Sequence, residues 1–353
     1  MNLNDEISQY RQEIKTQRMD MSFGEIANMY RDNELIISPE YQRSFRWDEQ
    51  RQTDFIESIL LGIPFPSIFV ATNEDGTWEL IDGLQRVSTV LSFLGELKPV
   101  DGKENVKNRL KLLEGGLVKG LKGLTFQTLP REYRLQIKRT PCRVEIILKE
   151  SNFNMRYELF KRLNTGGEGL SRQEIRNCIF RGLDSQYTNL IKELAGNDNF
   201  KSIIKINDQK QESMYYEELV LRFLALKNCI SDYSESNIQD FMDKYLKKQC
   251  ELFDAAQANE DKTLFLDIIN RLKLIGDDTI FSLGTQHFST SMYDAIMLGL
   301  SANRDSLKFS NEELLSKFVS LKNNLEFKKY IGSASSKPGS IKSKFKVAKQ
   351  VLA

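Results

Sequence analysis

The amino-acid sequence predicts an α+β fold, with a small mixed β-sheet in the first half of the chain and helices alone in the second. Short runs rich in β-branched residues, at 67–81 and 142–148, are typical of strands. An Asp-Gly turn signal at 73–76 predicts that 67–81 is a β-hairpin. After about residue 184 the strand signal fades, and apolar residues recur at helical spacing.

Capping signals in the sequence predict where the two helices that precede the hairpin begin. Ser22 and Glu25 have the spacing of a capping box and predict a helix over 21–30. Asp48 is the predicted N-cap of a second helix, which ends at Gly62. The rest of the first half is predicted to contain loops at 100–125 and a helix at 153–163.

A glycine loop at 164–169 leads into a further helix, which begins at a second capping box formed by Ser171 and Glu174. The buried side of this helix is expected to carry Ile175, Cys178 and Ile179.

The second half is predicted to be helical over 213–229, 236–252, 261–275, 290–301 and 311–323. A Ser/Gly/Pro-rich linker at 332–340 precedes a last helix at 341–352. The predicted domains are therefore an α/β domain at 1–185, a helical domain at 186–331, and a flexible linker with a basic helix at 332–353.

Composition favours an intracellular protein. No apolar run reaches the roughly 18 residues of a transmembrane helix, and residues 1–15 are too polar for a signal peptide. The four cysteines form no CxxC pair, so neither a zinc ribbon nor a disulfide framework is expected. We therefore expect the protein in a reduced cytoplasm.

Charge is distributed unevenly along the chain. The net charge is +1, but residues 184–326 carry −7 and residues 327–353 carry +7, with seven lysines and no acid. A near-neutral total therefore does not exclude nucleic-acid binding, which depends on a local basic surface. The single histidine, His287, is too few for an HNH or other His-metal nuclease and has no nucleophile beside it, so a surface or structural role is expected.

The first candidate site is Asp82-Gly83-Leu84-Gln85-Arg86, where the second hairpin strand passes into a helix. Such a junction directs free backbone N–H groups and a helix dipole at one point. Arg86 can contact phosphate, Asp82 can hold Mg²⁺ or orient water, and Gln85 can position a nucleophile. The alternative is a glycine turn with a structural salt bridge.

Two further segments are candidates. Tyr41-Gln42-Arg43 with Arg46 and Trp47 suits base stacking and phosphate contact; alternatively the aromatic rings anchor the core and the arginines are solvated. The second is the Asn164-Thr165-Gly166-Gly167 loop, with Arg172 in the helix that follows. Such a loop could bind an anion; alternatively it is an ordinary connection between two helices. There is no GxxxxGK[ST] sequence, so the chain is not a P-loop NTPase.

Taken in order, several segments resemble the N-terminal domain family of the GmrSD restriction systems. They are Pro39-Glu40-Tyr41-Gln42-Arg43 with Trp47, Ile63-Pro64-Phe65-Pro66, Ile81-Asp82-Gly83-Leu84-Gln85-Arg86, Phe160-Lys161-Arg162-Leu163-Asn164-Thr165-Gly166-Gly167 and Leu170-Ser171-Arg172-Gln173-Glu174-Ile175-Arg176-Asn177. In the motifs at 38–47, 81–86 and 160–177, one position differs from the usual family motif. Leu84 stands where the family has Gln. The similarity covers roughly residues 18–185.

This resemblance implies a ParB/sulfiredoxin-like fold, a small mixed-sheet nucleotide-binding architecture. It implies an NTP-binding and NTP-hydrolysing subunit, acting with Mg²⁺, in bacterial defence or modification-dependent restriction of phage DNA. The proposed site comprises Asp82, Gln85 and Arg86 as catalytic residues, with Arg43, Arg46, Trp47, Gly83, Asn164, Thr165 and Arg172 as nucleotide-binding residues. The chain has no residues for the HNH nuclease domain that follows in many relatives, so cutting is expected to need a partner nuclease.

The alternative is a non-enzymatic module that binds or senses DNA and recruits a nuclease; a homo-oligomer is compatible with either. The C-terminal helix bears on this choice. Lys342, Lys346 and Lys349 share one helical face, while Ile341, Phe345 and Leu352 share another. The lysines either contact DNA or only balance the negative charge of the helical domain.

Overall fold

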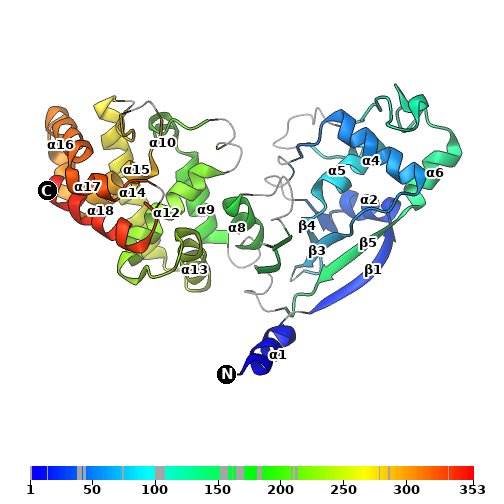
Figure 1. The fold of residues 1–353 in the computed structure, drawn as a ribbon, viewed down its shortest axis with the longest axis horizontal. Coiled ribbons are helices and arrows are strands. Elements are labelled where there is room, and N and C mark those ends of the chain that lie inside the picture. Colours follow the sequence, from blue (N-terminus) through cyan, green and yellow to red (C-terminus); the bar gives the residue numbers. More distant parts are fainter. Residues whose placement is uncertain are drawn as a thin grey trace. The chain divides into compact units, whose positions relative to one another are not determined.

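The computed structural model describes the chain except for residues 1, 14, 38–41, 43–44, 74, 100–107, 152–157, 161, 164–170, 181–184, 208–209, 211–213, 278, 285–286 and 333. The chain divides into two compact units, Met1–Leu170 and Ser171–Ala353 (Figure 1). A mixed α+β first unit and a helical second unit agree with the predicted fold class.

The first unit contains a five-stranded mixed sheet in the order β1-β5-β3-β4-β2. Its elements are α1 (Leu3–Glu13), β1 (Thr16–Ser22), α2 (Phe23–Arg31), β2 (Leu35–Ile36), α4 (Glu49–Leu61), β3 (Ile68–Thr72), β4 (Trp78–Asp82), α5 (Leu84–Leu94), a 3-10 turn (Lys119–Leu121), α6 (Arg131–Arg139) and β5 (Pro141–Ile147). The predicted hairpin is confirmed, because β3 and β4 pair antiparallel.

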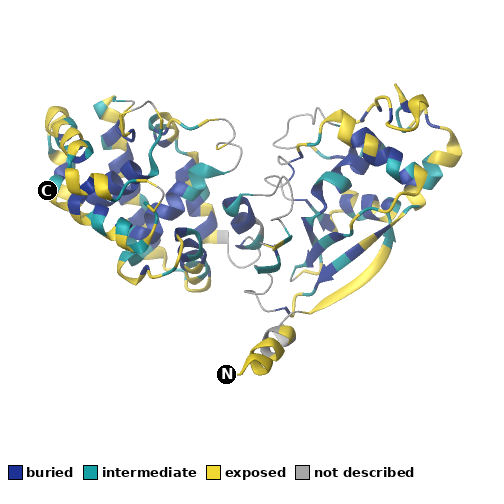
Figure 2. Ribbon diagram, in the orientation of Figure 1, coloured by how far each residue is buried: buried dark blue, intermediate teal, exposed yellow. Residues whose placement is uncertain are grey.

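Strands β3, β4 and β5 form the buried centre of the sheet, and α4 and α5 lie along one side of it (Figure 1). Val70, Leu80 and Ile81 are fully buried there. β1, by contrast, is an exposed edge strand (Figure 2). Its pairing with β5 is reinforced by two cross-strand ion pairs, Arg18–Glu145 at 2.8 Å and Asp20–Arg143 at 3.1 Å. Charged residues on an edge strand also discourage pairing with another chain.

The predicted caps of the first unit are confirmed. The Ser22 side chain accepts a hydrogen bond from the Glu25 N–H and begins α2. The Asp48 side chain accepts one from the Arg51 N–H and begins α4, which ends at Gly62 in the left-handed conformation. Sequence reasoning missed α1, β1 and α6, and most of the predicted helix at 153–163 lies outside the described residues.

The second unit is helical in its described residues, apart from one isolated bridge between Ser282 and Phe288. Its helices are α8 (Arg172–Phe180), α9 (Ser185–Gly196), α10 (Asp198–Ile203), α12 (Tyr215–Cys229), α13 (Ile238–Glu251), α14 (Ala255–Ile275), α15 (Thr290–Ala302), α16 (Asn311–Asn323), α17 (Leu325–Lys329) and α18 (Pro338–Val351), with 3-10 turns at Ile230–Asp232 and Arg304–Lys308. The five predicted helices correspond to α12 to α16. Helices α9 and α10 were not predicted.

The capping box that begins α8 is confirmed by reciprocal bonds between Ser171 and Glu174 at 2.6 and 3.2 Å. Ile175 is buried as predicted, but Ile179 is only half-buried, and the Cys178 side chain lies outside the description. In the described part of the chain, no helix combines the length and the apolar composition needed to cross a bilayer.

The C-terminal helix α18 packs closely against α15, where a Cβ on Gly299 would come within 2.6 Å of a Leu352 methyl. Ile341 and Leu352 are buried and Lys342, Lys346 and Lys349 are exposed, as predicted, while Phe345 is only half-buried. The predicted linker touches the unit at Ser336, whose carbonyl accepts from the Tyr233 hydroxyl at 2.6 Å.

Candidate functional site

The candidate site lies where β4 ends at Asp82 and α5 begins at Leu84. Gly83 joins the two with a φ of +96°, a conformation that favours glycine. A Cβ at this position would lie 2.6 Å from Cγ2 of Ile68 on the neighbouring strand. Both the conformation and the space therefore require glycine at the turn.

The first turn of α5 lacks a side-chain cap. Gly83 is the N-cap and has no side chain to offer, and the first helical bond runs from the Val87 N–H to the Gly83 carbonyl at 2.9 Å. The N–H groups of the preceding residues have no acceptor within the helix, and they carry the positive end of the helix dipole. This end of an eleven-residue helix therefore favours an anion.

Arg86 and Asp82 form an ion pair beside this turn. Arg86 Nη2 lies 2.9 Å from Asp82 Oδ2 and donates a second bond, of 3.0 Å, to the Ser67 carbonyl. Their side chains remain 16% and 33% exposed, so the pair borders solvent. Arg86 Nε is buried and has no hydrogen-bond partner among the described residues. The guanidinium is therefore incompletely paired.

Gln85 connects the β4–α5 junction to the Arg46–Trp47 part of the second predicted motif. Its Oε1 accepts hydrogen bonds from the backbone N–H groups of Arg46 and Trp47, each at 3.0 Å. The Arg46 side chain is exposed. The Trp47 ring packs edge-on against Phe55 with centroids 5.7 Å apart, the contact expected of a core anchor.

Two inward-facing neighbours limit what the site can contain. Leu84 is 4% exposed, so its side chain belongs to the core rather than to the site. Burial raises the pKa of the Cys142 thiol to about 11, although the positive charge of Arg86 acts in the opposite direction. Cys142 is therefore a neutral core residue near pH 7 rather than a nucleophile.

The remaining predicted site residues are not joined to this cluster by any described contact. Arg43, Asn164 and Thr165 lie outside the described residues. Arg172 belongs to the second unit, where its Nη1 lies 3.7 Å from Asp240 and 3.6 Å from Asp243. Its charge is thus directed toward carboxylates of α13.

The same helix contains a buried polar network that sequence reasoning missed. Arg176 is fully buried, with Nε 2.6 Å from Asp243 Oδ1 and Nη2 2.6 Å from Gln239 Oε1. Asn177 donates to Glu217 at 2.6 Å. Their spacing in sequence gave no signal of this, because the partners lie 40 to 67 residues away. The Arg176-Asn177 part of the motif is therefore structural in α8.

Metal-binding side chains do not cluster in the described part of the chain. No group of three or more His, Cys, Asp or Glu residues gathers there in a metal-binding arrangement, and His287 is exposed. A lone carboxylate such as Asp82 suits Mg²⁺ only when the ion's other ligands come from phosphate oxygens and water.

Part of the chain is similar to a known protein family. No curated protein and no solved structure is significantly similar to the chain. Residues 23–181 match the family model described as GmrSD restriction endonuclease, N-terminal domain. This segment includes the whole β4–α5 junction, both motifs joined by Gln85, and α8. Residues 23–181 are therefore a domain of the GmrSD N-terminal type.

Proposed function

We propose that the first unit binds and hydrolyses a nucleoside triphosphate at the β4–α5 junction, and that the protein is the nucleotide-dependent subunit of a bacterial DNA-restriction system. The family match supports the biological role. In this proposal the protein acts in the cytoplasm with a partner nuclease and contains no nuclease of its own. The mixed sheet and its strand-to-helix junction are compatible with the ParB/sulfiredoxin-like architecture that we propose for this unit.

The observation that carries the proposal is the incompletely paired cation at an uncapped helix start. Arg86 Nε is buried without a partner in the described structure, and the first turn of α5 has no side-chain cap. A phosphate group at this point would accept from the N–H groups of α5, and from the partly exposed Arg86 guanidinium once it turns toward the ligand. Neither feature is needed by a purely structural salt bridge.

Asp82 suits a nucleotide that arrives with Mg²⁺. Its Oδ2 is held by Arg86, while its Oδ1 makes no hydrogen bond among the described residues. One carboxylate oxygen is sufficient for an ion whose other ligands are phosphate oxygens and water. Bound Mg²⁺ would supply charge neutralisation at the phosphates, and Arg86 with the α5 N–H groups would stabilise the charge that develops there.

Gln85 couples the start of α5 to the second predicted motif. Because its side-chain carbonyl accepts from the backbone of Arg46 and Trp47, a shift at the start of α5 would be transmitted to these two residues. We further propose Arg43 and Arg46 as nucleotide contacts, with Asn164 and Thr165 as further candidate contacts.

The proposal is tested by phosphate release from ATP and GTP with Mg²⁺, in the presence and absence of DNA. Asp82→Asn keeps the shape of the side chain but removes its charge, so release is expected to fall at least tenfold. Glu145→Gln, which alters the cross-strand ion pair between β5 and β1, is the matched control. Absence of nucleotide turnover and binding in the wild-type protein would refute the proposal.

A second candidate, a DNA-binding module without enzymatic activity, is favoured by one observation. Residues 108–143 contain nine Lys or Arg and two Glu, a net charge of +7. Nucleotide turnover would distinguish the two functions, since a passive module has none.

A further inference from the structure

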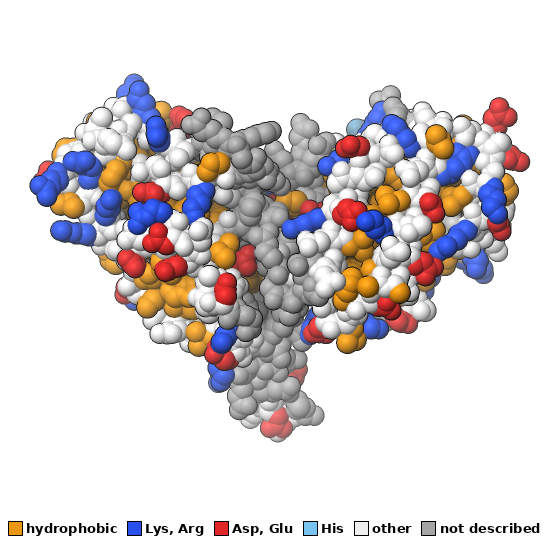
Figure 3. Space-filling view, turned by 180° about the vertical axis from the view of Figure 1, so that it is seen from behind, with side chains coloured by type: hydrophobic (Ala, Val, Ile, Leu, Met, Phe, Trp, Pro, Cys, Tyr) orange, Lys and Arg blue, Asp and Glu red, His pale blue; other side chains and the backbone are white. Residues whose placement is uncertain are grey.

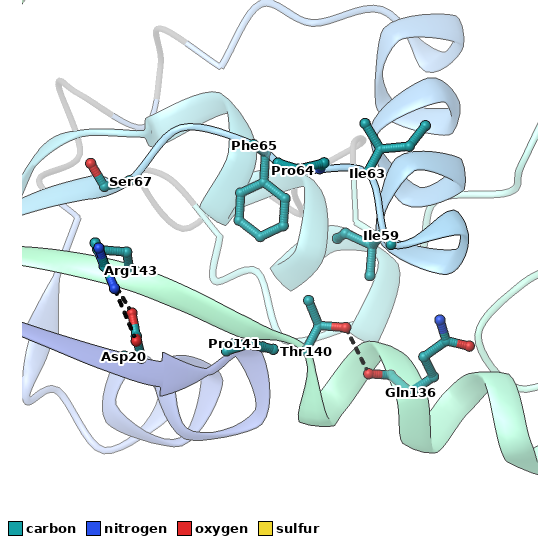
Figure 4. A pocket seen from close by; sticks show the side chains of 11 residues that line it. Asp20, Ile59, Ile63, Pro64, Phe65, Ser67, Gln136, Thr140, Pro141 and Arg143 are labelled. Carbon is teal, nitrogen blue, oxygen red and sulfur yellow. Dashed lines mark hydrogen bonds and ion pairs between the residues drawn. The ribbon is translucent and has the colours of Figure 1, made fainter.

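A pocket separate from the β4–α5 junction lies in the first unit, between the end of α4 and the end of α6. Its volume is about 550 Å³, within the range of ligand-binding sites. Ile63, Pro64 and Phe65 form one wall, and Gln136 of α6 and Thr140 just after that helix face them (Figure 4). The Asp20–Arg143 ion pair of the sheet closes one end.

The walls of this pocket suit a flat, partly polar ligand. Phe65 is backed by Phe55 and Phe23, with ring centroids 5.4 and 5.6 Å away, so its position is fixed. Ile63 is 45% exposed beside it. An aromatic ring held in place and flanked by aliphatic side chains offers a stacking surface at little entropic cost.

Polar atoms in the pocket are available for recognition. Gln136 donates through Nε2 to the Leu60 carbonyl at 2.8 Å, which fixes the amide and leaves its Oε1 without a hydrogen bond in the described structure. The Ser67 hydroxyl also makes none there. A donor and an acceptor beside an aromatic wall are the groups that read the edge of a nucleobase.

The helix that supplies Gln136 is strongly basic on its outer side. Arg131, Lys138 and Arg139 of α6 are exposed, and none of the three has an acidic partner within ion-pair distance among the described residues. Lys and Arg side chains gather at the outer edge of this unit, on the left of Figure 3, where α6 lies.

The adjoining loop extends the basic surface. Lys138 Nζ lies 5.5 Å from the centroid of the Phe126 ring, which joins α6 to the 108–129 segment. That segment contributes exposed Arg109, Lys111 and Lys122, also without acidic partners in the described part of the chain. Clustered unpaired cations favour a polyanion, because each phosphate contact releases counterions.

We propose that α6 and the pocket together form a nucleic-acid site: the cations of α6 hold the backbone of a DNA strand, and an unpaired or extruded base of that strand enters the pocket against Phe65. The choice of DNA rests on the proposed role in restriction. The site is separate from the nucleotide junction but shares one residue with it, because Ser67 lines the pocket and its carbonyl accepts from Arg86.

The backbone contacts are tested by fluorescence anisotropy with a labelled oligothymidylate over a range of salt concentrations. The triple variant Arg131→Ala/Lys138→Ala/Arg139→Ala is expected to bind at least about tenfold more weakly at low salt, and to lose roughly 0.7 from the salt slope for each contact removed. The control with matched charge is Lys342→Ala/Lys346→Ala/Lys349→Ala on α18. Equal losses in both variants, or a loss in the α18 variant alone, would overturn the assignment to α6.

The base pocket is tested with an abasic oligomer of equal length, which retains the phosphates but has no bases. The wild-type protein is expected to prefer oligothymidylate by about 5- to 100-fold. Ile63→Trp, which fills the pocket, should abolish this preference, whereas Leu61→Trp should keep it, because Leu61 is similarly exposed at 44% but does not line the pocket. Equal wild-type affinity for the two oligomers, or a preference that survives in Ile63→Trp, would overturn the base pocket.

Nucleotide binding by Ile63→Trp separates this inference from the proposed function. The variant is expected to bind NTP as the wild type does, because Ile63 is not part of the β4–α5 junction. A circular-dichroism melting curve for each variant confirms that the fold is retained. If Ile63→Trp proves unfolded, the wild-type comparison of the two oligomers still decides the base pocket.

Discussion

Two of the Arg–Asp pairs, one from each unit, differ in how completely their polar atoms are paired. In the helical unit, Arg222 and Asp294 are 5% and 2% exposed and share two bonds, of 2.6 and 2.7 Å. In the α/β unit, Arg86 and Asp82 share one bond of 2.9 Å at the solvent boundary, and Arg86 Nε has no partner in the described structure.

This difference separates a pair that stabilises the fold from one that can bind a ligand. Arg222 also donates to Ser336, and the Lys344 ammonium approaches Asp294 at 3.9 Å, so the buried pair joins α12 and α15 to the C-terminal segment. Few donors or acceptors of this pair are left to contact a ligand. Arg86 and Asp82 are only four residues apart and retain unused donors and acceptors, as a binding site requires.

The largest expected effect is on the buried pair. Asp294→Ala leaves Arg222 and Lys344 buried without their carboxylate, which is expected to reduce the free energy of unfolding by about 3–5 kcal/mol. Urea denaturation measures this. Asp82→Ala, in the half-buried pair at the solvent boundary, is the control and should cost less than about 1 kcal/mol. Similar losses in the two variants would remove the distinction between the pairs.

The next effect concerns the turn of the candidate site. Gly83→Ala must place a Cβ 2.6 Å from Ile68 Cγ2 at a φ of +96°, so we expect a loss of about 1–3 kcal/mol in stability, together with weaker nucleotide binding. Gly62 also has a positive φ but open space around it. Gly62→Ala should therefore cost less, about 1 kcal/mol, and leave nucleotide binding unchanged. If Gly83→Ala is tolerated as well as Gly62→Ala, the close packing against Ile68 contributes neither to stability nor to nucleotide binding.

The smallest effect is a pH dependence in the helical unit. Burial lowers the pKa of Lys344 from 10.5 to about 8, although Asp294 acts in the opposite direction. Between these pH values the unfolded chain holds the proton and the folded chain does not, so the free energy of unfolding should rise with pH, by at most about 1.4 kcal/mol per pH unit.

Denaturation of the wild type and of Lys344→Met at pH 8 and pH 9.5 isolates this contribution, because both proteins share the other titrating groups. The wild type should gain stability relative to Lys344→Met over that interval. A constant difference between them would mean that Lys344 keeps its proton when buried.

The local signals in the sequence predicted much of the fold. The caps at Ser22, Asp48 and Ser171 and the Asp-Gly turn each depend on residues within a few positions, and each is confirmed. β1 was missed because its residues are mostly exposed and its partner strand β5 lies more than 120 residues away in the sequence.

The candidate site was predicted unevenly for the same reason. The junction at Asp82 to Arg86 is local, so its strand, turn and helix could be anticipated. The link from Gln85 to the Arg46–Trp47 backbone spans 38 to 39 residues, and the pocket between α4 and α6 depends on tertiary packing. Arg172 was grouped with the site by motif order, whereas its charge is directed toward the carboxylates of α13.

The central claim is that the incompletely paired Arg86 at the start of α5 binds the phosphates of a nucleotide. Calorimetric titration of ATP and GTP with Mg²⁺ into wild-type protein and Arg86→Ala tests it most directly, with Arg18→Ala, an exposed ion-paired arginine of the same unit, as the control. Loss of one charge-assisted contact should weaken binding by roughly 10- to 100-fold in Arg86→Ala, with a folded protein and unchanged binding by Arg18→Ala. Equal affinity of Arg86→Ala and the wild type would contradict the claim.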